Sequence, residues 1–118
     1  MSQFSLGEFT PVADQVYVAV AEPAAVNIGL VVGPSGCLVI DTGSSPEQGA
    51  AVRAAAERFA GVPVVAVVVT HWHFDHLFGL AGFTGVPGFA HETVRARLAH
   101  PDCREVAESL GLDVAALA

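Results

Sequence analysis

Hydrophobic positions in the first part of the chain follow the two-residue spacing of β-strands. Between residues 15 and 20, every second residue is valine, which is typical of a half-buried strand. Val26–Val32 and Cys37–Ile40 are two further apolar segments, and residues 33–36 (Gly-Pro-Ser-Gly) between them favour a tight turn. We expect these two segments to pair as an antiparallel hairpin.

The pattern changes to helical spacing after residue 45. Ser45 is a residue type that caps helices, Pro46 suits the first helical position, and Gln48 is placed to complete a capping box. Gly61 is expected to end this helix. Apolar residues recur between these signals on one predicted helix face: Val52, Ala55, Ala56 and Phe59.

A second apolar segment, Val64–Val69, follows the predicted helix. It does not alternate, so we expect a strand that is covered on both faces. The order strand, helix, strand predicts a parallel crossover. Glycines over residues 79–88 predict turns, a short strand is expected at 89–90, and helices are expected over 92–99 and 102–110.

Four residues that commonly bind metals follow the strand at Val64–Val69: His71, His73, Asp75 and His76. Ligands of α/β proteins bind at the carboxyl ends of such strands. An extended backbone would send His71, His73 and Asp75 to one side and His76 to the other, which suits two adjacent metal positions. A helix would place His71 and His73 about 200° apart. Burying these groups without a metal would leave several of them unpaired, so the pattern predicts a metal centre.

The composition excludes several classes of protein. The net charge is −7 and the chain contains no lysine, so it lacks the basic surface of a nucleic-acid-binding protein. No apolar run reaches the roughly 18 residues of a membrane span, and residues 1–10 do not resemble a secretory signal. Cys37 and Cys103 are too few for a disulfide framework. We therefore expect a cytoplasmic protein without nucleic-acid or membrane partners.

The balance of residue types is unusually apolar for so short a chain. Hydrophobic residues make up 53% and charged residues 14% of the 118 residues, although small domains expose much of their surface. We expect protein to cover the excess apolar surface. Either a partner chain covers it, or these residues are part of a larger domain.

Two motifs resemble the metallo-β-lactamase superfamily of metallohydrolases. They are Thr-His-Trp-His-Phe-Asp-His at residues 70–76 and Val-Ile-Asp-Thr-Gly at residues 39–43, and the match extends over about residues 16–100. The resemblance implies an α/β fold, the αββα (α+β) sandwich that two similar halves form. Residues 1–118 would then be a partial domain, the N-terminal half, truncated at the C-terminus.

The resemblance also assigns roles to the motif residues. His71 and His73 would hold a first zinc ion, and Asp75 and His76 would hold a second. Asp41 would not contact the metal itself, but it would support the loop that carries these ligands. Iron and manganese are alternative metals, because the same donors accept them.

The implied reaction is hydrolysis of an ester, thioester, lactone or amide bond in a small-molecule substrate. Metal-activated water would attack the substrate, and Asp75 would orient that water. The family also uses a further histidine, a bridging aspartate and a late histidine, all from the second half. His91, His100, Asp102 and Asp113 are the residues left to fill these places, and we expect packing, surface or capping roles for them. The chain alone is therefore expected to be inactive.

Two alternatives remain open. The chain could be a natural half-length binding or assembly module that forms a homodimer, since two similar halves build the parent fold. It could also be an iron-dependent oxygenase of the same fold that uses His71, His73 and a ligand from elsewhere.

Overall fold

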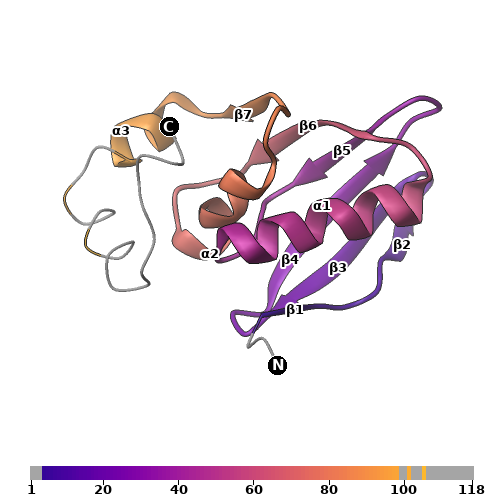
Figure 1. Ribbon diagram of the computed structural model, residues 1–118, viewed down its shortest axis with the longest axis horizontal. Helices are drawn as coiled ribbons and strands as arrows, with labels where there is room; N and C mark the ends of the chain where they lie inside the picture. The colour runs from indigo at the N-terminus through magenta and orange to yellow at the C-terminus, as the bar shows by residue number, and fades with distance from the viewer. Residues whose placement is uncertain (1–3, 99–100, 102–104, 106–118) are drawn as a thin grey trace.

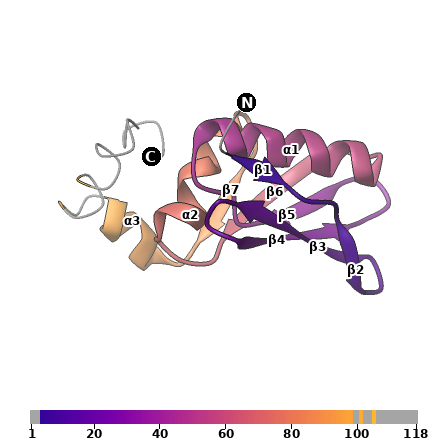
Figure 2. The ribbon, with the colours of Figure 1, turned by 90° about the horizontal axis from the view of Figure 1, so that it is seen from below.

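The computed structural model describes residues 4–98, 101 and 105. One mixed sheet lies behind the long helix α1, and the short helical segments α2 and η1 lie beyond the end of strand β6 (Figures 1 and 2). The strands are β1 (Ser5–Leu6), β2 (Thr10–Ala13), β3 (Val16–Glu22), β4 (Val26–Val32), β5 (Cys37–Ile40), β6 (Val64–Val69) and β7 (Gly88–Ala90). The helical segments are α1 (Pro46–Ala60), α2 (Phe74–Leu77), η1 (Phe78–Gly82) and α3 (Glu92–Leu98).

The sheet combines an antiparallel and a parallel part. In the described residues its order is β1-β3-β4-β5-β6-β7, and β2 also pairs with β3. The β4–β5 pair is antiparallel, which confirms the predicted hairpin, whereas β5, β6 and β7 are parallel. Helix α1 connects β5 to β6, as the predicted crossover requires. The carboxyl ends of β5 and β6 therefore meet at one edge of the sheet.

The residues at the two ends of α1 act as predicted, with one difference. The Ser45 side chain accepts a hydrogen bond from the Gln48 N–H, and Gly61 ends the helix in the left-handed region at φ 71°. Gln48 does not complete the expected capping box with Ser45, because its Oε1 accepts from the Ser44 N–H at 2.8 Å. Its Nε2 donates to the carbonyls of Ser5 and Glu22, so the buried amide fastens the start of α1 to β1 and β3.

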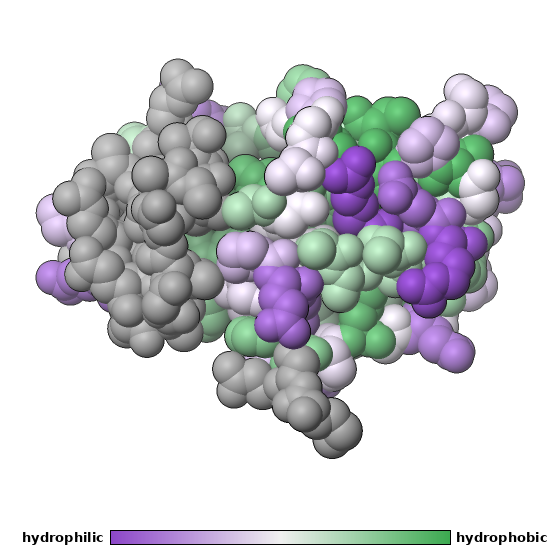
Figure 3. Space-filling model, in the orientation of Figure 1, coloured by the Kyte–Doolittle hydropathy of each residue, from purple (hydrophilic) through white to green (hydrophobic). Residues whose placement is uncertain are grey.

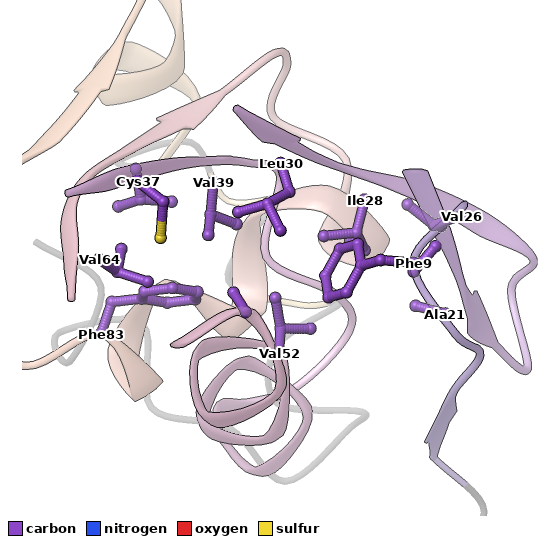
Figure 4. Close-up of a cluster of buried hydrophobic side chains, with 13 residues drawn as sticks. Phe9, Ala21, Val26, Ile28, Leu30, Cys37, Val39, Val52, Val64 and Phe83 are labelled. Carbon is purple, nitrogen blue, oxygen red and sulfur yellow. The ribbon is translucent and has the colours of Figure 1, made fainter. Parts of the chain in front are cut away.

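The hydrophobic core lies between α1 and one face of the sheet (Figure 4). Ile28, Leu30 and Val39 project from adjacent strands toward Val52 of α1, and all four side chains are fully buried. The exposed surface on the α1 side mixes hydrophilic and hydrophobic residues (Figure 3). No helix in the described residues is long and apolar enough to cross a membrane.

The second face of the sheet is apolar but only partly covered by the described residues. The register Val18↔Gly29↔Ile40↔Val68↔Phe89 runs across five strands on this face, which we call the outer face. Phe89 is 58% exposed, and Ile40 and Val68 are half-buried. The prediction that Val64–Val69 is covered on both faces is therefore wrong for this part of the chain, because α1 covers one face alone. A valine segment without alternation does not indicate which face of the strand is covered.

Three expectations concern the chain after residue 88. The short strand predicted at residues 89–90 forms as β7, and the helix predicted over 92–99 forms as α3, which ends at Leu98 within the described residues. Of the helix predicted over 102–110, the structure describes Glu105 alone, which is helical, and the other positions lie outside the described residues. Strands β1 and β2 were not predicted, since β2 contains Pro11 and neither strand shows apolar alternation.

Candidate metal centre

The predicted metal ligands follow β6, and Asp41 follows the adjacent parallel strand β5. The Asp41 N–H donates to the Val68 carbonyl at 2.7 Å, so the two strand ends are joined where the loops begin. Figure 1 shows α2 beyond the end of β6, close to the start of α1. The site thus lies at the carboxyl edge of the parallel strands, where α/β sheets bind their ligands.

The backbone of the histidine segment turns sooner than an extended chain would. His73 precedes helix α2, which begins at Phe74, and the His76 N–H donates to the His73 carbonyl at 3.0 Å. This turn brings the His76 ring back to His71, with 4.1 Å between the ring centroids. The prediction that His76 points away from His71 and His73 is therefore wrong. A four-residue helix gives no periodic apolar signal, so the sequence did not reveal the turn.

The four side chains lie within one small cluster. The rings of His71 and His73 are 4.7 Å apart between centroids, and the Asp75 Oδ1 lies 3.8 Å from the His76 Nε2. Within the described residues, however, no three His, Cys, Asp or Glu side chains form a group that could hold one ion as they stand. The cluster supplies the nitrogen and oxygen donors that zinc accepts, but it does not close around a metal by itself.

Asp41 connects the two sides of this site. Its side chain is 6% exposed, and the carboxylate accepts hydrogen bonds from the Thr70 N–H at 2.8 Å and from the Thr70 hydroxyl at 2.9 and 3.0 Å. The same carboxylate lies 2.7 Å from the His76 Nδ1. Asp41 has a φ of 70°, a left-handed conformation that aspartate tolerates better than most residues. These contacts place the Asp41 carboxylate against the loop that carries the histidines.

Thr42 holds the backbone of the same histidine. Its N–H donates to the His76 carbonyl at 3.0 Å, and its hydroxyl donates to the same oxygen at 2.7 Å. The side chain of Thr42 is fully buried. Consecutive residues at the end of β5 therefore contact the side chain and the backbone of His76. The motif stretches included Thr42 and Thr70, but the sequence assigned neither a role.

The hydrogen bonds determine which ring nitrogen of His76 is free. An ionised carboxylate only accepts hydrogen bonds, so the His76 Nδ1 must carry the proton that Asp41 receives. In its neutral form, the ring then presents its Nε2 lone pair. Metal-binding histidines commonly have such a carboxylate on the ring nitrogen that does not bind the metal.

The His71 side chain is biased toward its neutral form. Burial lowers its pKa below the ordinary value of 6.5, and the nearby His76 and His73 lower the pKa further, although Asp41 and Asp75 act in the opposite direction. Metal binding requires a neutral imidazole. His71 therefore favours the protonation state that a metal ligand needs.

The spare metal-capable residues do not join this cluster in the described residues. The His91 Nδ1 lies 3.0 Å from the Thr93 hydroxyl and accepts from the Thr93 N–H at 3.2 Å, so His91 caps the start of α3. His100, Asp102 and Asp113 lie outside the described residues.

Comparisons with known proteins identify the family of this chain. Residues 21–111 match the family model described as the metallo-beta-lactamase superfamily. A curated relative, the linear primary-alkylsulfatase of a Pseudomonas species, is 35% identical over 54 residues, which are 46% of this chain and 10% of that protein.

Two solved structures from Erythrobacter litoralis are also similar. A metallo-beta-lactamase with beta-mercaptoethanol in its active site is 27% identical, with a TM-score of 0.63 over 95% of this chain and 48% of its own. An NDM/FIM-1-like metallo-beta-lactamase in its mono-zinc form is 28% identical, with a TM-score of 0.62 over 80% of this chain and 46% of its own. The chain thus spans about half the length of the solved structures that it matches. The family model covers most of the chain and both motifs, and the fold agrees with it: this chain belongs to the metallo-β-lactamase superfamily.

Proposed function

We propose that this chain carries the first group of ligands in a zinc-dependent hydrolase of small molecules. His71 and His73 would hold one ion, and Asp75 and His76 would hold a second. The observation that carries the proposal is the buried Asp41 carboxylate at the edge of β5, which is hydrogen-bonded to His76 and to the Thr70 that precedes His71. Family membership and the mono-zinc form of one structural relative support the choice of zinc.

The chemistry of such a centre suits hydrolysis of an ester, thioester, lactone or amide bond. Bound there, zinc supplies Lewis acidity that polarises a carbonyl and lowers the pKa of a water molecule to about 7. The Asp75 carboxylate lies beside His76 and is partly exposed in the described part of the chain. We assign to Asp75 the role of orienting the attacking water. Asp41 instead keeps the His76 ring in place through its buried hydrogen bond.

We place the remaining ligands outside the described residues. The described side chains form no three-ligand group, and the chain spans about half the length of its structural relatives. The polypeptide that supplies the other ligands would also cover the outer face of the sheet. On this proposal the 118-residue chain binds zinc weakly and is inactive when it is tested alone.

The metal content of the purified chain tests the choice of metal. After expression in medium that contains iron, zinc and manganese, we expect zinc to exceed the other two metals in the protein. A predominance of iron would overturn the zinc assignment and favour the iron-dependent oxygenase. Hydrolysis of aryl esters and thioesters by the chain, with and without a segment that completes the fold, then tests the reaction class.

The outer face favours a second candidate, a half-length module that forms a homodimer. Apolar residues cross five strands on this face, and Phe89 is 58% exposed there. Sedimentation separates the two cases, because a discrete dimer supports the module and association without a defined stoichiometry favours a half that lacks its complement.

A further inference from the structure

The hydroxyl of Thr70 lies between the buried carboxylate and the first histidine of the cluster. Its Oγ1 is 2.9 and 3.0 Å from the two carboxylate oxygens of Asp41, and 2.8 Å from the His71 Nδ1. The Thr70 N–H also donates to Asp41 at 2.8 Å, so the residue is held at two points. Two carboxylate oxygens and one ring nitrogen therefore meet at one hydroxyl that carries a single proton.

Counting protons assigns the donor in each contact. The Asp41 carboxylate accepts hydrogen bonds and has none to give, so the Thr70 hydroxyl proton points to Asp41. If that proton pointed to His71 instead, lone pairs of the hydroxyl and the carboxylate would face each other at about 2.9 Å. The contact between Thr70 and His71 must then be an N–H donation from the His71 Nδ1 to the hydroxyl oxygen.

We infer that Thr70 is a positioning residue, whose hydroxyl keeps the proton of neutral His71 on Nδ1 and so presents Nε2 to the metal. Asp41 acts on His76 directly and on His71 through Thr70, so one carboxylate orients two ligands. The inference rests on the proposed metal site, because the free Nε2 atoms serve a purpose only if they bind an ion. It adds Thr70 to the residues that determine metal affinity.

The exposure of Thr70 allows a clean test. Thr70 as a whole is exposed, so Thr70→Val removes the hydroxyl with little loss of packing, whereas Thr70→Ser keeps it. Thr10→Val is the matched control, because Thr10 is also exposed and its hydroxyl donates to the Val18 carbonyl in a strand pair far along the chain from the site.

The first measurement is nitrogen NMR of the histidine rings in the metal-free 118-residue chain, at a mildly alkaline pH. We expect His71 and His76 to carry their protons on Nδ1 in the unaltered chain, in Thr70→Ser and in Thr10→Val. In Thr70→Val, His71 should shift toward the Nε2–H form while His76 stays unchanged. His71 with its proton on Nε2 in the unaltered chain, or an unchanged His71 in folded Thr70→Val, would overturn the inference.

The second measurement is zinc affinity by titration calorimetry of the same variants. We expect Thr70→Val to weaken binding by about 10-fold, the lower end for residues that act through a ligand, and Thr70→Ser and Thr10→Val to stay within about 2-fold of the unaltered chain. Zinc binding unaffected in Thr70→Val, despite a shifted His71 proton, would contradict the positioning role. If the rings have the expected protons but the unaltered chain binds no zinc, the proposed function fails and the proton assignment stands.

Discussion

The Nδ1 of His76 lies 2.7 Å from the Oδ2 of Asp41, although 35 positions separate the two residues in the chain. The contact exists because α1 carries the chain back to the start of β6, so that β6 runs parallel to β5 and both strands end on the same side of the sheet. The crossover thus brings a buried carboxylate to a short helical turn that carries histidine. The arrangement of the site depends on this topology as much as on the motif itself.

Replacing Asp41 by Asn should weaken zinc binding more than it perturbs the fold. The Asn amide has nearly the same size, but it has one oxygen that can accept hydrogen bonds where the carboxylate has two. The Asp41 carboxylate now accepts hydrogen bonds from both Thr70 and His76. We expect a 10–100-fold loss of zinc affinity, and a loss of about 1–3 kcal/mol in the free energy of unfolding. Calorimetric titration and urea unfolding of the same variant measure both.

The control for this variant is Asp14→Asn, which removes a charge at an exposed position. It should change neither zinc affinity nor stability by a measurable amount. If Asp41→Asn binds zinc as tightly as the unaltered chain, Asp41 is only a turn residue before α1 and our assignment is wrong.

The close approach of η1 to the end of β5 should make Gly79 intolerant of a side chain. A Cβ at Gly79 would overlap the Thr42 carbonyl oxygen and would lie 3.0 Å from the Gly49 Cα of α1. Because backbone atoms must move, we expect Gly79→Ala to lower the free energy of unfolding by about 3 kcal/mol or more. Gly88→Ala is the matched control, since its Cβ would meet only side-chain carbons at 3.4 Å or beyond. Equal unfolding midpoints for the two variants would show that the approach is not as close as described.

The buried thiol of Cys37 should make stability fall at alkaline pH. Burial raises the pKa of Cys37 above its ordinary value of 9.0, and the charge of Glu57 raises it further. The folded state therefore retains the proton more strongly than the unfolded chain does. This contribution to stability is fully present below pH 9.0 and is lost as the pH rises through the folded-state pKa. Urea unfolding on either side of that pH should show a steeper decline for the unaltered chain than for Cys37→Ala, and parallel declines would contradict the assignment.

The outer face should make the 118-residue chain associate with itself. Val20 is 38% exposed on this face, away from the metal cluster, and its cross-strand partner is Asn27. We expect Val20→Glu to reduce concentration-dependent association in sedimentation experiments, because a charge there opposes burial of the face. Ala54→Glu adds the same charge at an exposed position of α1 and should leave association unchanged. Equal association of both variants would mean that the outer face is not the contact surface.

Local signals predicted the elements that frame the site. Ser45, Pro46 and Gly61 bound α1 as their chemistry requires, and the apolar segments become β4, β5 and β6 at the predicted residues. These signals depend on residues close in sequence, so they can be interpreted without the rest of the fold.

Features that depend on distant neighbours were not accessible in the same way. The direction of His76 depends on a single helical turn after His73, which leaves no periodic pattern. The contacts of Thr42 with the His76 backbone, and of Thr70 with Asp41 and His71, appear only when β5 and β6 are placed side by side. The sequence therefore indicated the ligands but not the hydrogen bonds that orient them.

Zinc titration of the 118-residue chain and two histidine variants tests the central claim most directly. His71→Ala removes a proposed ligand, whereas His91→Ala removes a histidine that caps α3. We predict that His71→Ala weakens zinc binding by several tens-fold or more. Loss of a residue that only supports a ligand typically costs 10–100-fold in metal affinity, and loss of a ligand itself should cost more than the lower end of that range. His91→Ala should bind zinc as the unaltered chain does. Equal zinc affinity in all three proteins, with their folds intact, would show that the cluster after β6 is not a metal site.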